Sequence, residues 1–205
     1  FEAAARRWGI DDGSEVVVYD DAGALAAARA WWLLRHAGLE RVQVLDGGLG
    51  AWTDAGGQLA LGYEQAEPGS VSLSWGRMPV VEYDELGQVA GTLIDSRATA
   101  RYLGIEEPVD PVAGHIPGAR NRPTTDNLDA QMRFHAPDAL QASFAKLGAD
   151  RPGSAAYCGS GITASHQVLA RPAPGSSWRC SPAAGPNTAP TRMRRSPRAT
   201  SSTAT

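Results

Sequence analysis

Residues 153–162 read GSAAYCGSGI, and residues 13–24 read GSEVVVYDDAGA. Each stretch is a short apolar segment that ends in tyrosine, followed by a turn containing glycine and then by a helix-like segment. Each is also preceded by a segment with the pattern of an amphipathic helix ending at glycine, residues 1–9 and 140–148. The chain therefore contains two copies of one strand–turn–helix unit.

The segments around the two copies extend the same alternation of helices and strands. The Ala- and Leu-rich segment 24–36 predicts a long helix, and residues 42–45 and 92–95 predict buried strands. Residues 46–48, DGG, predict a tight turn with Trp52 packed beneath it. Strands that alternate with helices pair in parallel. We therefore expect an α/β fold of tandem domains, each a parallel sheet flanked by helices.

Comparison of the two copies predicts that both domains are incomplete. We expect residues 1–62 to form the C-terminal half of a first domain and residues 63–78 to be a linker. Residues 79–170 are expected to form a second domain that lacks its last elements, and residues 171–205 to form a tail. By the same comparison, about half a domain is expected to precede Phe1.

The tail differs sharply in composition from the rest of the chain. It lacks Leu, Ile, Val, Phe and Tyr, and it is rich in Ala, Pro, Ser, Thr, Gly and Arg. Such a composition cannot bury a core, so we expect the tail to be disordered and Cys180 within it to be incidental. The abrupt change near Ala170 indicates either a shifted reading frame or a genuine low-complexity tail.

The overall composition excludes several classes of protein. With 42% hydrophobic and 20% charged residues, the 205-residue chain has a globular composition. The formal net charge is −3 although the tail contributes six arginines, and such an acidic body argues against a nucleic-acid partner. The sequence shows neither a run of about 18 apolar residues nor a secretory signal, so we expect no membrane partner. Two cysteines make no disulfide framework, which favours a reducing cytoplasm, and with four histidines they show no metal-ligand spacing.

Cys158 lies between the predicted strand and the predicted helix of the second copy. Backbone N–H groups of a glycine-rich loop and the start of a helix both favour negative charge, as a reactive thiolate requires. The alternative is that Cys158 is a small buried hydrophobic residue. Because the Cys-Gly-Ser-Gly loop has no bulky side chain to bury the sulfur, we favour a nucleophile.

Several short motifs in this order, together with the repeat, resemble the two-domain rhodanese family. Thiosulfate sulfurtransferases and 3-mercaptopyruvate sulfurtransferases belong to that family. The resemblance covers about residues 1–169. The motifs are CGSGITA at 158–164, DSR at 95–97, RYLG at 101–104, Glu107-Pro108, GHIPGA at 114–119, and DGG at 46–48 with Trp52.

The resemblance implies a sulfurtransferase with one active domain and no cofactor. Asp20 stands where the first domain would carry the catalytic cysteine, which implies a non-catalytic first domain beside a catalytic second one. Cys158 would take the outer sulfur of 3-mercaptopyruvate or thiosulfate as a persulfide and pass it to cyanide, a thiol or a protein acceptor. The loop residues expected to hold the sulfur and the donor are Gly159, Ser160, Gly161, Ile162 and Thr163.

Two arginines at the end of the strand 92–95 are the expected donor-binding residues. The resemblance assigns the donor's anionic group to Arg101, with Arg97 second, because a guanidinium suits a carboxylate or a thiosulfonate. The alternative is that one or both pair with Asp95 or Glu107. The neutral Gly-Ser loop favours mercaptopyruvate as the donor.

The sequence departs from the family pattern in two places. Val109 occupies the position of a second arginine that many mercaptopyruvate-specific relatives carry. The Asp and His that such enzymes draw from the first domain would lie before Phe1.

Two alternative functions compete with sulfur transfer. A Cys-based phosphatase needs an arginine six residues after its cysteine, and Ala164 stands there. A catalytically silent sulfur carrier, an interaction module or an inactive fragment stays open, because both domains read as incomplete. Of the histidines, His115 is expected to stabilise its turn, and His166 is expected to be solvated or to act as a cap.

Overall fold

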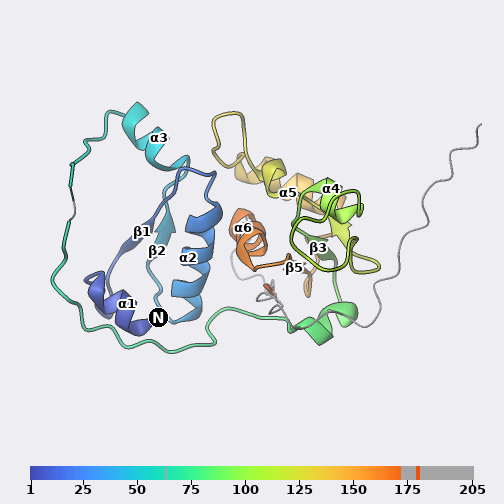
Figure 1. The fold of residues 1–205 in the computed structure, drawn as a ribbon, viewed down its shortest axis with the longest axis horizontal. Coiled ribbons are helices and arrows are strands. Elements are labelled where there is room, and N and C mark those ends of the chain that lie inside the picture. The colour runs from blue at the N-terminus through green and yellow to red at the C-terminus, as the bar shows by residue number, and fades with distance from the viewer. Residues whose placement is uncertain (63, 172–178, 181–205) are drawn as a thin grey trace, which may run out of the picture.

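The computed structural model describes residues 1–62, 64–171 and 179–180. Within them the chain forms two parallel sheets with their flanking helices, which lie side by side along the longest axis (Figure 1). This architecture confirms the predicted α/β class. The described residues contain no helix with the length and apolar character of a membrane span.

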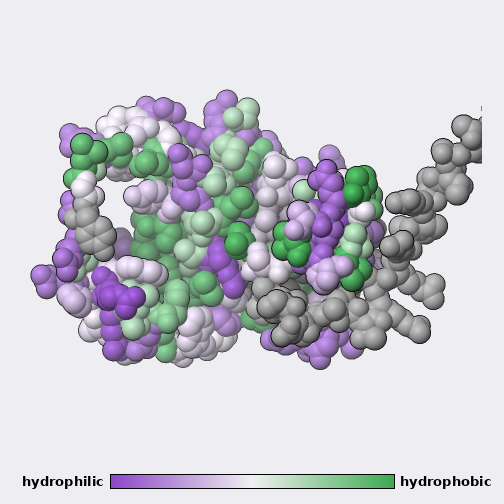
Figure 2. Space-filling model, in the orientation of Figure 1, coloured by the Kyte–Doolittle hydropathy of each residue, from purple (hydrophilic) through white to green (hydrophobic). Residues whose placement is uncertain are grey.

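The first sheet contains two parallel strands, with Val16 opposite Val42. The elements of this half are α1 (Glu2–Arg7), β1 (Val16–Val18), α2 (Leu25–His36), β2 (Val42–Val44) and α3 (Gly48–Asp54). Leu34 of α2 and Val42 of β2 share a buried apolar cluster with Val71 from the following segment. On the other hand, Val17 and Tyr19 are more than half exposed, and Figure 2 shows apolar residues gathered over this sheet.

The second sheet contains four parallel strands in the order β4-β3-β5-β6. Its strands are β3 (Leu93–Asp95), β4 (Arg120–Asn121), β5 (Ala155–Tyr157) and β6 (Arg179–Cys180). Its helices are the 3-10 helices η1 (Tyr83–Gln88) and η2 (Thr124–Asn127) and the α-helices α4 (Thr99–Tyr102), α5 (Pro137–Lys146) and α6 (Ile162–Ala170). The central strands β3 and β5 are buried along their whole length.

Residues 13–24 and 153–162 adopt the same conformation. In each, a three-residue strand leads through a turn into a helix, and the chain then returns to a parallel neighbouring strand. Gly23 and Gly161, three residues after Asp20 and Cys158, both have a positive φ, 64° and 76°. In the first copy Ala24, which lies between Gly23 and α2, also has a φ of 64°. Glycine adopts this conformation without strain, which favours it in both turns. Asp20 and Cys158 consequently occupy the same place, just after the carboxyl end of a strand.

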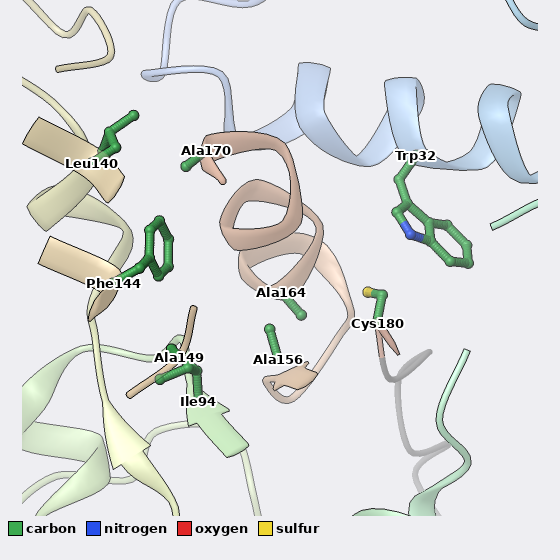
Figure 3. Close-up of a cluster of buried hydrophobic side chains, with 9 residues drawn as sticks. All are labelled: Trp32, Ile94, Leu140, Phe144, Ala149, Ala156, Ala164, Ala170 and Cys180. Atoms are coloured by element: carbon green, nitrogen blue, oxygen red, sulfur yellow. The ribbon is translucent and has the colours of Figure 1, made fainter. Parts of the chain in front are cut away.

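The two halves of the chain meet through α2 and α6. Figure 3 shows α6 between α2 on one side and α5 on the other. Trp32 of α2, Ala164 of α6 and Phe144 of α5 belong to one buried cluster that spans all three helices. The helix that follows Cys158 is therefore buried between the two halves, and burying its small side chains fixes the position of its N-terminus.

The structure differs from the sequence-based expectation within the tail. Residues 179–180 form β6, which pairs with β5 through Ala156 and Cys180. Cys180 is fully buried in the cluster of Figure 3 and is therefore part of the core rather than incidental. An average over the tail's composition cannot detect two residues that complete a sheet edge. The remainder of the predicted disordered tail, residues 172–178 and 181–205, lies outside the described residues.

The predicted tight turn after β2 is present, but Trp52 does not pack beneath it. Gly47 and Gly48 have φ values of 80° and 59°, and a Cβ atom at Gly48 would overlap the carbonyl oxygen of Asp20. Trp52 is nearly half exposed, and its indole N–H donates to the carbonyl of Gln58. The turn therefore depends on the close approach of two backbone segments rather than on an aromatic side chain.

Candidate functional site

Cys158 lies at the carboxyl end of β5, between that strand and α6. The backbone N–H of Gly161 donates to its Sγ at 3.0 Å. This bond is possible because Gly161 adopts the left-handed conformation as the residue before α6, which directs its N–H back at the sulfur. The thiol is half-buried, so it is both held by the backbone and accessible. The Gly161 amide therefore holds the sulfur at the N-terminal end of α6.

The remaining loop residues surround the sulfur without burying it. Ser160 and Ile162 are exposed, and Thr163 is half-buried on the first turn of α6. Gly159 packs against a charged neighbour: a Cβ built there would lie 3.4 Å from both carboxylate oxygens of Asp110. The same position is 3.8 Å from Nη2 of Arg101. The structure therefore brings Arg101 beside the Cys158 loop, as the sequence predicted.

Arg97 is buried, with only 4% of its surface exposed, and it is bonded throughout to other parts of the chain. Its Nη2 lies 2.7 Å from Asp95 Oδ2 and 2.6 Å from the carbonyl oxygen of Gly114. Its Nη1 lies 3.3 Å from Glu107 and 3.2 Å from Asp110. Burial alone would lower the pKa of Arg97, but the hydrogen bond and charge of Asp95 outweigh it and raise that pKa. Arg97 thus pairs with Asp95 and Glu107, and Arg101 also pairs with Glu107, as the alternative interpretation of the two arginines describes.

Arg101 is more exposed than Arg97 and shares two of its partners. Its Nη2 lies 2.6 Å from Glu107 Oε1 and 2.8 Å from Asp110 Oδ2. Burial would raise the pKa of Glu107, but hydrogen bonds from Arg101 and from the amides of Asp110 and Val109 lower it. Glu107 is therefore a fixed anion beneath Arg101, while the Arg101 side chain keeps 20% of its surface exposed.

Asp95 and Tyr157, which are not among the site residues predicted from the sequence, also belong to this network. Asp95 is fully buried and accepts a hydrogen bond of 2.7 Å from the hydroxyl of Tyr157, the residue before Cys158. Burial and the charge of Asp95 raise the pKa of Tyr157, which keeps its hydroxyl protonated as a donor.

The predicted turn role of His115 agrees with its ring, which stacks on Tyr102 and lies 2.7 Å from the Tyr102 carbonyl oxygen.

In the first half of the chain, Asp20 is held as Cys158 is held in the second. Its carboxylate accepts hydrogen bonds from the backbone N–H groups of Ala22, Ala24 and Ala27 at 2.8–2.9 Å. Partial burial would raise the pKa of Asp20, but these amides lower it. Asp20 is therefore ionised near neutral pH. A carboxylate cannot carry a transferred sulfur atom as a thiolate can.

Comparison with known proteins agrees with this geometry. Residues 1–55 match the family model described as the rhodanese-like domain. Over 170 residues the chain is 44% identical to a probable 3-mercaptopyruvate sulfurtransferase of Pseudomonas aeruginosa, covering 80% of this chain and 60% of the relative. The chain belongs to the rhodanese family.

Further relatives match a similar share of this rhodanese. A putative thiosulfate sulfurtransferase, SseB, of Mycobacterium tuberculosis is 41% identical over 175 residues, covering 82% of this chain and 62% of the relative. The crystal structure of the 3-mercaptopyruvate sulfurtransferase SseA of Escherichia coli superposes with a TM-score of 0.71 at 32% identity, covering 83% of this chain and 66% of that one. The chain thus spans about 60% of the length of the curated relatives it matches.

His166 of this rhodanese is neither solvated nor a cap, so the sequence-based expectation is wrong. The ring is fully buried between the halves of the chain, where Nε2 lies 3.0 Å from the carbonyl oxygen of Gly23. Nδ1 lies 3.2 Å from the side-chain nitrogen of Asn127, whose oxygen accepts from Arg122. These partners require a neutral ring that donates through Nε2 and accepts at Nδ1. Residues of the first half of the chain cover the face of α6 that the sequence pattern predicts to be polar and exposed.

This buried histidine predicts a pH-dependent stability. Burial lowers the pKa of His166 to about 4, against a usual value near 6.5. The unfolded chain therefore binds a proton more readily than the folded chain between these values, so the stabilisation is complete above about pH 6.5 and is lost as the pH falls towards 4. Over that window the free energy of unfolding should fall by up to about 3 kcal/mol because of His166.

The measurement is chemical denaturation of the parent and of His166→Gln, which cannot titrate, at intervals from pH 7 to pH 4. Asp20 is the nearby acid, and its lowered pKa places its own effect below this window. The difference between the two proteins should shrink as the pH falls. Parallel stability curves would contradict the assigned neutral state.

Proposed function

We propose that this chain carries the sulfur-transferring site of a sulfurtransferase, with Cys158 as the carrier. The single observation that carries the proposal is the sulfur of Cys158 at the carboxyl end of β5, bonded to the Gly161 amide and half exposed. A sulfur nucleophile in that position forms a persulfide readily. The names of the relatives that match this part of the chain support the same reaction.

The reaction divides into two displacements. The Cys158 thiolate attacks the donor's sulfur, forming a sulfur–sulfur bond, and the bond that held this sulfur in the donor breaks. With 3-mercaptopyruvate a carbon–sulfur bond breaks and pyruvate leaves after protonation at carbon; with thiosulfate a sulfur–sulfur bond breaks and sulfite leaves. A thiol or cyanide then attacks the outer sulfur, and the Cys158 thiolate is released unchanged.

In this proposal the other residues bind and orient. Arg101 holds the donor's anionic group, since its guanidinium lies beside Gly159 and is partly exposed. The amide of Gly161 holds the negative charge on sulfur, and Ser160 and Thr163 supply hydroxyl donors at the mouth of the loop. Arg97 holds the carboxylates of Asp95, Glu107 and Asp110 in place through its ion pairs. The neutral loop favours 3-mercaptopyruvate over the dianionic thiosulfate.

The proposal extends to the organisation of the chain. Residues 1–62 would be the non-catalytic half, with Asp20 in place of a cysteine, and residues 79–170 with β6 would be the catalytic one. A chain with two cysteines has no disulfide framework, which suits a reducing cytoplasm. A catalytically silent carrier is the competing function, because Arg101 is already paired with two carboxylates.

The test is the intact mass of the protein after exposure to 3-mercaptopyruvate and, separately, to thiosulfate. A gain of one sulfur atom, mapped by peptide mass spectrometry to Cys158 and removed by cyanide, is the expected result. A stable sulfur adduct that neither cyanide nor a thiol removes would indicate a silent carrier. Absence of any adduct with either donor would refute the proposal.

A further inference from the structure

We propose that the carboxylate of Asp110 occupies the position on Arg101 where the donor's anionic group binds, so that a donor binds by displacing it. This inference rests on the proposed function for its biological meaning. It makes Asp110 a specificity-determining residue of the Cys158 site.

The two carboxylates that bind Arg101 differ in burial and in the number of their partners. Glu107 is 6% exposed and is held by the amides of Val109 and Asp110 as well as by both arginines. The side chain of Asp110 is 31% exposed, and its recorded bonds are to Nη2 of Arg101 and Nη1 of Arg97. Glu107 therefore belongs to the framework, and Asp110 is the partner that can leave with the smaller loss of contacts.

Asp110 lies beside the Cys158 loop. Both of its carboxylate oxygens lie 3.4 Å from the point where a Cβ of Gly159 would stand, one residue from the nucleophile. A small donor whose sulfur meets Cys158 and whose carboxylate meets Arg101 must place that carboxylate in the same region. Asp110 and such a donor therefore compete for one guanidinium.

The loop that carries Asp110 runs from Gly104 to Gly114, whose backbones approach closely: a Cβ at Gly104 would lie 3.3 Å from the Gly114 nitrogen. Glu107 anchors this loop through both arginines, whereas the neighbouring Val109 side chain is more than 70% exposed and packs little against Asp110. The Asp110 side chain can therefore turn away from Arg101 while the Glu107 network stays in place.

The exchange has a consequence for the charge of the donor. Arg97 and Arg101 face three carboxylates, so the cluster has no spare positive charge while Asp110 is bound. A monocarboxylate replaces one negative charge by another, whereas a dianion adds a second charge next to the displaced Asp110. The site therefore selects small monocarboxylate donors.

The experiment measures alkylation of Cys158 by iodoacetate and by iodoacetamide, with peptide mass spectrometry to locate the adduct. In both reactions the thiolate attacks carbon, a carbon–sulfur bond forms and iodide leaves; the two reagents differ in the carboxylate. In Asp110→Asn the ratio of the iodoacetate rate to the iodoacetamide rate should rise about tenfold. That factor corresponds to a parent protein in which Asp110 leaves its position on Arg101 open about a tenth of the time. Unfolding midpoints confirm that the near-isosteric variant is folded.

Two further variants separate displacement from a general charge effect. Glu106→Gln removes an exposed carboxylate of the same loop and should leave the ratio unchanged. In an Arg101→Gln background, Asp110→Asn should have no effect on the ratio, because the position for which both anions compete is gone. An equal gain in that background, or a ratio that is unchanged or lower in Asp110→Asn alone, would overturn the inference.

Alkylation requires no sulfur transfer, so the two proposals fail separately. A protein that gains no sulfur from either donor but shows the Arg101-dependent rise would lose the proposed function and keep the displaceable carboxylate. A protein that forms the persulfide should need several-fold less 3-mercaptopyruvate for half-maximal rate in Asp110→Asn. An unaltered requirement in that variant would contradict the role of Asp110 while leaving Cys158 as the carrier.

Discussion

Cys158→Ser is expected to abolish sulfur transfer, reducing the rate of sulfane-sulfur loss from 3-mercaptopyruvate by at least about a thousandfold. The hydroxyl of serine is not ionised near neutral pH, and an oxygen cannot form the sulfur–sulfur bond that stores the transferred atom. The Gly161 amide would remain in place, so the variant should fold as the parent does. Loss of activity would therefore report chemistry rather than structure.

Cys180→Ala is the matched control for this substitution. Burial raises the pKa of Cys180 to about 12, so this thiol stays protonated at neutral pH and should neither take up sulfur nor contribute to the rate. Persulfide mass and acceptor turnover, measured for both variants, check the prediction. If Cys158→Ser still takes up sulfur and this uptake disappears when Cys180 is also replaced, Cys180 is the carrier and the prediction is wrong.

Arg97→Met is expected to lower the free energy of unfolding by about 3–5 kcal/mol, the usual loss when one member of a buried ion pair is removed. Asp95 is fully buried and would then lack its guanidinium partner, while Glu107, which is nearly buried, would keep Arg101. Asp95 would keep two neutral donors, the Tyr157 hydroxyl and the backbone N–H of residue 97. A methionine of similar length fills the space but offers neither charge nor hydrogen bonds.

Urea denaturation of the parent, Arg97→Met and Arg41→Met measures this effect. Arg41 pairs with Glu15 at 3.2 Å, but both side chains are more than half exposed, so its replacement should cost less than about 1 kcal/mol. A loss of that same small size for Arg97→Met would show that the buried network contributes little. A large loss would explain why this arginine is not available for a donor.

The main strands and helices are the parts of this protein that its sequence predicts well. The predicted strand 42–45 appears as Val42–Val44, and the predicted helix 24–36 as Leu25–His36. Cys158 could be selected because the glycines around it allow only a tight turn from strand to helix. Asp110 could have been suspected from its position three residues after Glu107, but the sequence does not show which arginine it meets.

The errors concern burial and pairing between distant segments. His166 reads as polar on its helix, and the carbonyl of Gly23 that buries and binds it is 143 residues away in the chain. Cys180 reads as part of a tail without a core, yet it completes a sheet beside β5. Arg97 and Arg101 have the same chemistry and lie four residues apart, and only the carboxylates around them make one structural and the other partly free.

The sequence by itself determined the two strand–turn–helix copies, their parallel pairing and the cysteine at the end of the second strand. These features depend on the periodicity of apolar residues and on the backbone freedom of glycine, which act between near neighbours in the chain. Only the tertiary structure decided the roles of His166, Cys180, Arg97 and Asp110. The pairing of a charge and the exclusion of water depend on which distant segments come into contact, and no local pattern specifies that.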